Sequence, residues 1–295
     1  MTQTLPSILI TIDVEDWFQV ENLRPWFPPS SWASCELRAE KNTLQLLDLF
    51  DRQSIKATFF ILGWIAERLP DLVREIAKQG HEVASHGYGH FMCDQVSEKE
   101  LKDDLVKSKT LLEKILGSEI QGYRAPNFSI HDRALNLVQE CGYQYDSSYN
   151  NFNRHGRYGK ITLHENQKQG IAYAFENHFY ELPVSNLNFG QAIIPWGGGG
   201  YFRLLPPWLY KAGLRHSLKQ NNAFVFYMHP WEIDPGQPRV KNVSGLNGWK
   251  HYLNLDKTYD RLEDLIQSFR HCEFITCSQY LSKTVIETVE NRLKQ

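Results

Sequence analysis

The sequence of 295 residues contains only five cysteines, and none of its apolar runs is long enough to cross a bilayer. The cysteines are scattered and lack the CxxC spacing of redox motifs; they are Cys35, Cys93, Cys141, Cys272 and Cys277. This pattern favours free thiols in a reducing compartment over a disulfide framework. Because no stretch approaches the ~18 apolar residues of a membrane span, we expect no transmembrane segment.

The N-terminus also lacks the features of a secretory signal. Residues 1–6 lead directly into the apolar residues 8–10 and then Asp13, without a basic start, a long apolar core or a small-residue cleavage site. Together with the free thiols, this predicts a cytoplasmic protein.

Neither sign of charge is in excess, since 32 Lys and Arg stand against 34 Asp and Glu and give a net charge of -2. Without a basic surplus there is no electrostatic reason to expect nucleic acid as a partner. Phosphate loops are missing too, because the glycines at 197–200 fit neither GxxxxGK[ST] nor GxGxxG. We interpret them as backbone that turns sharply or approaches a ligand closely.

Strand-like and helix-like segments alternate along the chain, which predicts an α/β fold with mostly parallel strands. The clearest helix covers residues 96–116, where Ser97 and Glu100 form a capping box and Gly117 follows the last turn. The length suits one (β/α) barrel, and no repeat or linker divides the chain. We therefore expect a single domain over residues 1–295. The expected strands are 7–12, 57–62, 81–84, 120–123, 143–148, 180–187, 223–228 and 273–276.

Polar side chains follow the ends of many of these expected strands. Carboxyl ends of parallel strands meet at one face of a barrel, so residues at these positions converge even when they lie far apart in sequence. Two histidines four residues apart are a weak signal alone, but with a carboxylate and open positions they fit a catalytic zinc-type site. The converging residues are Asp13, Glu15, Asp16, His86, His90, Arg124, Asp146 and His229.

In these residues the sequence resembles the NodB-type polysaccharide deacetylases, carbohydrate esterase family 4. It is most similar to the branch associated with bacterial exopolysaccharide and exosortase (PEP-CTERM) systems. Five motifs occur in the family's order: residues 11–16 match TFDD, residues 86–90 match H[ST]xxH, residues 124–126 match RxPxG, Asp146 begins the fourth, and residues 227–229 match the strand ending in LxH.

The resemblance implies a distorted (β/α) barrel of about seven strands, a NodB homology domain, with a family-specific C-terminal part from about residue 236. The implied enzyme is a metal-dependent hydrolase that removes N-acetyl groups from amino sugars of a bacterial polysaccharide or of a carrier-linked precursor. Its implied cofactor is a divalent metal, and Zn²⁺ is the ion we expect.

The resemblance also implies a role for each matched residue. Asp13 would be the general base, oriented by Arg124. His229 would protonate the leaving amine, and Asp146 would hold the His229 ring and keep it positively charged. His86 and His90 would bind the metal. The implied substrate-binding residues are Pro126, Tyr149 and Trp231, which is next to His229. The metal and a backbone N–H near Tyr149 would stabilise the oxyanion.

The third metal ligand stays open at this point, because Val14 occupies the place of the usual aspartate. Glu15 would be the ligand if the sequence follows a DxD-like pattern, whereas Asp16 is the candidate that keeps the aspartate of the family motif. A further alternative is that these residues only cap the following segment. Two other functions are alternatives: a metal-independent amidohydrolase of the same fold acting on a small amide, and an inactive barrel that binds glycan. The intact histidines and the retained Asp13 and His229 favour the deacetylase over both.

Overall fold

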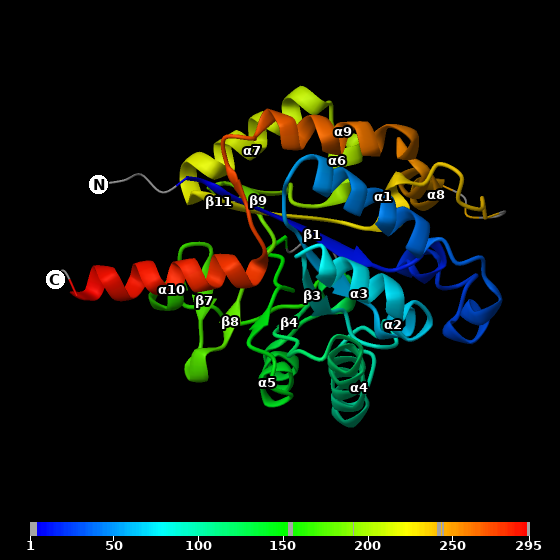
Figure 1. The fold of residues 1–295 in the computed structure, drawn as a ribbon, viewed down its shortest axis with the longest axis horizontal. Coiled ribbons are helices and arrows are strands. Elements are labelled where there is room, and N and C mark those ends of the chain that lie inside the picture. Colours follow the sequence, from blue (N-terminus) through cyan, green and yellow to red (C-terminus); the bar gives the residue numbers. More distant parts are fainter. Residues whose placement is uncertain (1–4, 153–155, 191, 241–242, 244, 294–295) are drawn as a thin grey trace.

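A curled, mostly parallel sheet organises the computed structural model, which describes residues 5–152, 156–190, 192–240, 243 and 245–293. In this part of the chain, seven strands run parallel to one another in the order β11-β1-β2-β3-β4-β5-β8 (Figure 1). The predicted α/β fold, a distorted barrel of about seven strands, is confirmed. The strands are β1 (Ser7–Val14), β2 (Thr58–Ile61), β3 (Glu82–Ser85), β4 (Gly122–Tyr123), β5 (Tyr145–Asp146), β8 (Tyr180–Glu181) and β11 (Ala223–Met228).

The described residues also form five further strands. β7 (Ala172–Ala174) and β6 (Lys168–Gln169) continue the sheet antiparallel beyond β8, and neither was expected from the sequence. β9 (Asn186–Phe189) and β10 (Ala192–Pro195) form a separate hairpin. β12 (Glu273–Phe274) pairs with the start of β1, on the edge that β2 shares farther along.

The curl of the sheet is completed by irregular backbone between β8 and β11. The Gly197 N–H donates to the Ser185 carbonyl at 2.7 Å, and the Tyr227 N–H donates to the Gly197 carbonyl at 2.7 Å. The run of glycines therefore lies between the two outer parallel strands and joins them.

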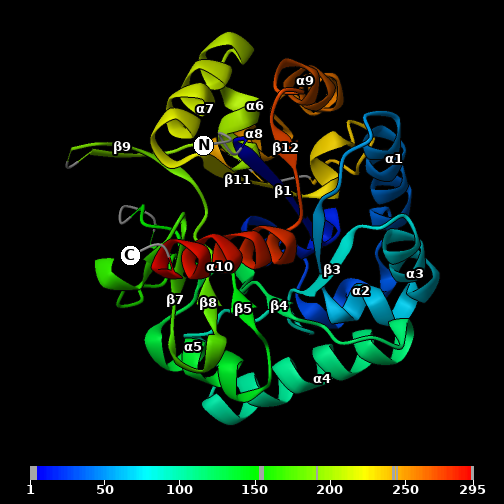
Figure 2. The same cartoon turned by 60° about the vertical axis from the view of Figure 1, so that its left-hand side comes forward.

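Helices surround the sheet, as Figure 2 shows. The helix predicted over 96–116 is α4, with the Ser97–Glu100 capping box and a left-handed Gly117 at φ 68°. Residues 63–78 form two helices, because Pro70 starts the second one after a non-helical Leu69. The helices are α1 (Ala39–Arg52), α2 (Gly63–Arg68), α3 (Pro70–Lys78), α4 (Glu98–Leu116), α5 (Asp132–Glu140), α6 (Gly199–Leu204), α7 (Pro207–Asn221), α8 (Gly245–Tyr252), α9 (Leu255–Ser268) and α10 (Cys277–Leu293).

Side-chain alternation along the strands creates two apolar clusters. Ile8 and Ile10 of β1 belong to a large cluster between sheet and helices, whereas Leu9 belongs to a smaller cluster inside the curl. α10 closes this inner cluster at the amino end of the strands, since Leu281 joins it and the Cys277 N–H donates to Thr58 Oγ1 at 2.9 Å. The carboxyl end of the sheet is left for polar groups.

The described helices include none with the length and apolar character that spanning a bilayer requires.

Candidate active site

Three buried side chains converge at the carboxyl end of the sheet. Glu15 follows β1, His86 and His90 follow β3, and one ligand atom from each lies within 4.8 Å of the others. The closest pair is His90 Nε2 and Glu15 Oε2, at 2.7 Å. A carboxylate and two imidazoles at this spacing match the donor set of a catalytic zinc site with open coordination positions.

The turn between the two histidines is shaped by α4. Asp104 accepts hydrogen bonds from the Tyr88 N–H at 2.7 Å and from the Gly89 N–H at 2.8 Å. Gly87 has φ 71°, and a Cβ on it would lie 2.8 Å from Asp104 Oδ2, so only glycine fits here. His90 itself has φ 54°, a left-handed conformation that the turn imposes.

Asp104 is a site residue that the sequence reasoning missed. Asp104 is buried, at 9% exposure. Its spacing from Leu101 and Ser108 was an available signal, since residues three and four apart share one helix face and both of these are buried.

The protonation states of Glu15 and His86 suit metal binding. His86 Nδ1 donates to the Arg124 carbonyl at 2.8 Å, which leaves Nε2 as the free ring nitrogen. Burial lowers the pKa of His86 to about 4, so its imidazole is neutral at pH 7. Burial opposes ionisation of Glu15, but the neighbouring His90 and His229 lower its pKa to about 2. Neutral imidazole and ionised carboxylate are the forms that ligate metals.

Asp16 lies outside this cluster and serves the backbone instead. Its Oδ1 accepts from the Trp17 N–H at 2.8 Å, and its Oδ2 accepts from the N–H groups of Arg38 at 2.6 Å and Ala39 at 2.7 Å. It thereby holds the start of the 3-10 helix η1 (Trp17–Gln19) and the start of α1. Of the two alternatives for a third ligand, the geometry favours Glu15.

Asp13 is held by a fully buried arginine, as expected. Arg124 Nη1 donates to Asp13 Oδ1 at 2.8 Å and to Thr11 Oγ1 at 2.7 Å. Its Nε donates to the Ser147 carbonyl at 2.8 Å, and its guanidinium carbon lies 4.1 Å from the centre of the Phe60 ring. These contacts fix the guanidinium and, through it, the Asp13 carboxylate.

The expected pairing of Asp146 with His229 is wrong. β5 and β8 are in a register that places Asp146 opposite Glu181. Asp146 accepts from the Ser148 hydroxyl at 2.5 Å and from the Ser148 N–H at 3.1 Å. Burial and the charge of Asp146 raise the pKa of Glu181 well above its usual range, so Glu181 keeps a proton that it shares with Asp146. Asp146 is therefore fully engaged away from His229.

The partner of His229 is Glu232, which the sequence reasoning missed. His229 Nδ1 and Glu232 Oε1 are 2.8 Å apart, and His229 Nε2 lies 3.4 Å from Glu15 Oε1. Burial would lower the pKa of His229, but the Glu15 and Glu232 carboxylates raise it to about 9. Glu232 lies three residues after His229, a capping-box spacing that the sequence displays.

A cavity of about 360 Å³ opens over these groups. Neither Pro126 nor Tyr149, both expected to contact substrate, lines it, whereas the neighbouring Asn127 and Phe128 do. The Tyr149 N–H donates to Glu181 Oε1 at 2.9 Å, so this N–H is not available to stabilise an oxyanion. The wall contains Asp13, Glu15, His86, His90, His229 and Trp231, and the rim contains Arg157, Trp249 and Lys250.

Two family matches cover most of the chain. Residues 31–145 match the family model described as polysaccharide deacetylase, which supports the predicted resemblance. Residues 147–282 match a domain of unknown function, DUF3473. His86 and His90 lie in the first segment and His229 in the second, while Glu15 precedes both.

Curated relatives match a similar length of chain. A peptidoglycan-N-acetylglucosamine deacetylase from Bacillus cereus is 33% identical over 102 residues, which are 35% of this chain and 47% of the relative. A peptidoglycan deacetylase-like protein from Gibberella zeae is 37% identical over 106 residues, or 35% of this chain and 31% of the relative. The chain thus matches less than half the length of either protein.

Solved structures match nearly the whole chain. A protein described as a polysaccharide deacetylase from Mycobacterium smegmatis has a TM-score of 0.64 at 20% identity, over 98% of this chain and 93% of its own. Puue allantoinase has a TM-score of 0.61 at 13% identity, over 94% of this chain and 89% of its own. At these identities the likeness concerns the fold alone.

Proposed function

We propose that this protein is a metal-dependent deacetylase that hydrolyses N-acetyl groups on amino sugars of a bacterial polysaccharide or its precursor. The observation that carries the proposal is the convergence of Glu15, His86 and His90 with Asp13 and His229 in one cavity. The family match over residues 31–145 supports the reaction class.

Glu15, His86 and His90 would hold the divalent metal, and Zn²⁺ fits two imidazoles and one carboxylate best. Their fit rests on the convergence of the ligand atoms and on the carbonyl that orients His86. When bound, the metal supplies a Lewis acid for the amide carbonyl and lowers the pKa of a nearby water.

Asp13 and His229 would manage the protons of the hydrolysis. Asp13 accepts the proton of the attacking water, and Arg124 holds its carboxylate in place. His229 delivers a proton from Nε2 to the nitrogen of the sugar amine as the C–N bond breaks. Water and the acetamide group are thereby converted into acetate and a free amine.

The substrate would enter over an aromatic rim. Trp231 is buried in the cavity wall, whereas Trp249 is 51% exposed at the rim and offers a flat face to a sugar ring. We propose a glycan or a carrier-linked sugar, and a place among exopolysaccharide and exosortase systems, from the motif pattern and the compatible DUF3473 match. A cytoplasmic location is proposed from the cysteine pattern.

A chelation experiment on the purified chain tests this function. The protein is stripped of metal, reloaded with Zn²⁺ and assayed for acetate release from chitooligosaccharides, peptidoglycan fragments and lipid-linked N-acetyl sugars, with allantoin as the small-amide comparison. We expect one metal ion per chain and acetate release that is lost on stripping and restored on reloading. Release that survives stripping, or hydrolysis of allantoin alone, would overturn the proposal.

A further inference from the structure

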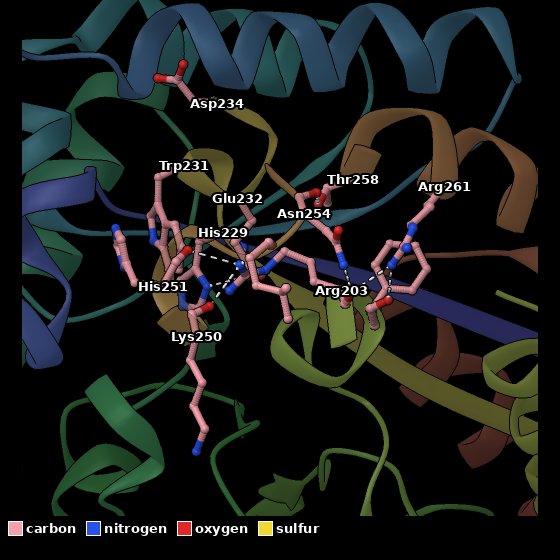
Figure 3. A network of polar contacts seen from close by, with 12 residues as sticks. Arg203, His229, Trp231, Glu232, Asp234, Lys250, His251, Asn254, Thr258 and Arg261 are labelled. Atoms are coloured by element: carbon pink, nitrogen blue, oxygen red, sulfur yellow. Dashed lines mark hydrogen bonds and ion pairs between the residues drawn. The ribbon is translucent and has the colours of Figure 1, made fainter. Parts of the chain in front are cut away.

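Glu232 and Arg203 form a buried ion pair next to His229 (Figure 3). The pair lies at Nδ1 of His229, whereas Glu15 lies at Nε2. Glu232 Oε1 accepts from His229 Nδ1 at 2.8 Å and from the His229 N–H at 3.1 Å, while Oε2 accepts from Arg203 Nε at 2.6 Å. Glu232 is 1% exposed and Arg203 is 4% exposed. Each carboxylate oxygen is committed to one partner, so the orientation of Glu232 is fixed from both sides.

Arg203 is itself immobilised by the end of α8 and the turn that follows it. Its Nη1 donates to the carbonyls of Lys250 at 3.1 Å, His251 at 3.0 Å and Leu253 at 2.8 Å, as the dashed lines in Figure 3 show. The guanidinium therefore links the rim of the cavity to the carboxylate behind His229.

The glycine run leaves room for this carboxylate. A Cβ on Gly199 would lie 2.4 Å from both oxygens of Glu232, closer than any side chain tolerates. The group that approaches Gly199 closely is therefore the Glu232 carboxylate, which belongs to the protein itself and is not a bound ligand.

Trp231 fixes the plane of the His229 ring. It stacks on His229 with ring centres 5.3 Å apart and 22° between planes, and on His251 at 4.5 Å and 16°. With Trp231 against its face and Glu232 at Nδ1, the imidazole has its Nε2 directed toward Glu15.

We propose that Glu232 and Arg203 are positioning residues for His229 and take the place that the resemblance gives to Asp146. Glu232 keeps a hydrogen on Nδ1 of His229 and thereby directs Nε2 toward the substrate. Arg203 acts only through Glu232. This inference rests on the proposed function for its kinetic consequence, but the hydrogen-bond arrangement can be tested without substrate.

The hydrogen-bond test uses the amide of glutamine as a probe. In Glu232→Gln, the charged Arg203 at 2.6 Å competes for the amide oxygen more strongly than the neutral backbone N–H of His229 at 3.1 Å, so the amide NH₂ faces His229 and requires Nδ1 to be an acceptor. In the double variant with Arg203→Met, the amide is free to turn and offer its oxygen to Nδ1. ¹⁵N NMR of the metal-loaded protein, assigned with His229→Gln, reports whether Nδ1 carries a hydrogen. We expect Nδ1 to carry a hydrogen in the wild type, to lack it in Glu232→Gln and to carry it again in the double variant. A hydrogen that stays on Nδ1 in Glu232→Gln would overturn the proposal.

The kinetic test is a double-mutant cycle on acetate release. We expect Glu232→Gln and Arg203→Met each to lower kcat by on the order of 100-fold with KM within about twofold, and the double variant to be no slower than Glu232→Gln. Independent, multiplying losses would contradict action of Arg203 through Glu232. Gly199→Ala displaces the carboxylate without changing charge and is expected to lower kcat as well, which covers the case in which Arg203→Met does not fold.

Arg261→Met is the matched control. Arg261 donates to the Arg203 carbonyl at 2.7 Å and forms no hydrogen bond or ion pair with Glu232 in the described structure, so its loss perturbs the same neighbourhood without touching the carboxylate. We expect kcat within about twofold of wild type. If the NMR result is as predicted but no sugar yields acetate, the proposed function is refuted. The positioning of His229 by Glu232 and Arg203 is then still supported.

Discussion

Carboxylates with several polar neighbours lie at both ends of the parallel sheet, Glu82 half-buried at one end and Glu15 buried at the other, and their partners differ. At the amino end, Glu82 accepts from Thr58 Oγ1 at 2.8 Å, from the Ser278 N–H at 3.1 Å and from the Tyr145 hydroxyl at 2.8 Å. At the carboxyl end, Glu15 faces His90 at 2.7 Å and His229 at 3.4 Å. Glu82 is saturated by neutral donors, whereas Glu15 shares its site with groups that can ligate metal or carry protons. The nature of the partners, more than burial itself, separates a structural carboxylate from a functional one.

The largest expected effect breaks the functional end alone. Asp13→Asn removes the proton acceptor while keeping the side-chain volume, and we expect acetate release to fall about 10³-fold. Zinc content by mass spectrometry and the unfolding midpoint should stay near wild type. Glu82→Gln is the control from the opposite end, with lower stability and an unchanged rate per folded molecule. Equal acetate release by wild type and Asp13→Asn would remove Asp13 from the mechanism.

The second prediction separates two adjacent carboxylates. Glu15→Gln should weaken Zn²⁺ binding about 100-fold, because the amide is a poorer ligand than the carboxylate. Asp16→Asn should bind Zn²⁺ as wild type does but lose about 1 kcal/mol of stability, because three backbone N–H groups lose an ionised acceptor. Competition with a chromophoric chelator measures affinity and urea unfolding measures stability. The reverse assignment of the two effects would make Asp16 the ligand.

The third prediction concerns pH at the amino end. Burial lowers the pKa of His81 to about 4, and its Nδ1 accepts from the Ala57 N–H at 3.1 Å, which requires the neutral ring. The unfolded chain binds this proton near pH 6.5 and the folded chain only near pH 4, so stability falls as the pH drops through this window. We expect His81 to contribute on the order of 2 kcal/mol to that loss.

Urea unfolding at several pH values compares wild type with His81→Asn, whose amide oxygen can accept from the same N–H and does not titrate. The stability difference between the two should shift between pH 6.5 and 4. Parallel pH curves for the two proteins would exclude His81 as the source.

The smallest expected effect lies at the cavity rim. Trp249→Ala removes an exposed aromatic face and should raise KM about fivefold for a glycan substrate, with kcat unchanged. Trp208→Ala provides the control, since Trp208 is 69% exposed and does not line the cavity. Equal KM values for wild type and Trp249→Ala would show that the sugar does not use this face.

Local chemistry made much of this molecule predictable. The apolar run of β1 and the acidic residues after it, the capping box of α4 and the glycine that ends it are all encoded within a few residues. The convergence of Asp13, His86 and His229 followed from the rule that parallel strands share a carboxyl end.

Long-range register was not predictable in the same way. Asp146 was assigned to His229 because nothing local reveals that β5 pairs with β8 and places Glu181 opposite it. The same limit hid Arg203, whose backbone partners lie in α8 and in the turn after it, about 50 residues farther along the chain. Each of these depends on which segments become neighbours, and that is decided by the closure of the whole sheet.

The position of β1 between β11 and β2 has a consequence for how the chain folds. Among the described strands β1 is the first along the chain, yet residues 7–12 pair with residues 223–228, and residues 7–8 also pair with residues 273–274. One edge of the first strand must therefore wait until more than 200 later residues have left the ribosome, a contact of high sequence separation that slows folding. Because His229 directly follows β11, the docking of this strand also brings His229 into the cavity, so Asp13 and His229, the two groups proposed to manage the protons, meet only after this long-range pairing has formed.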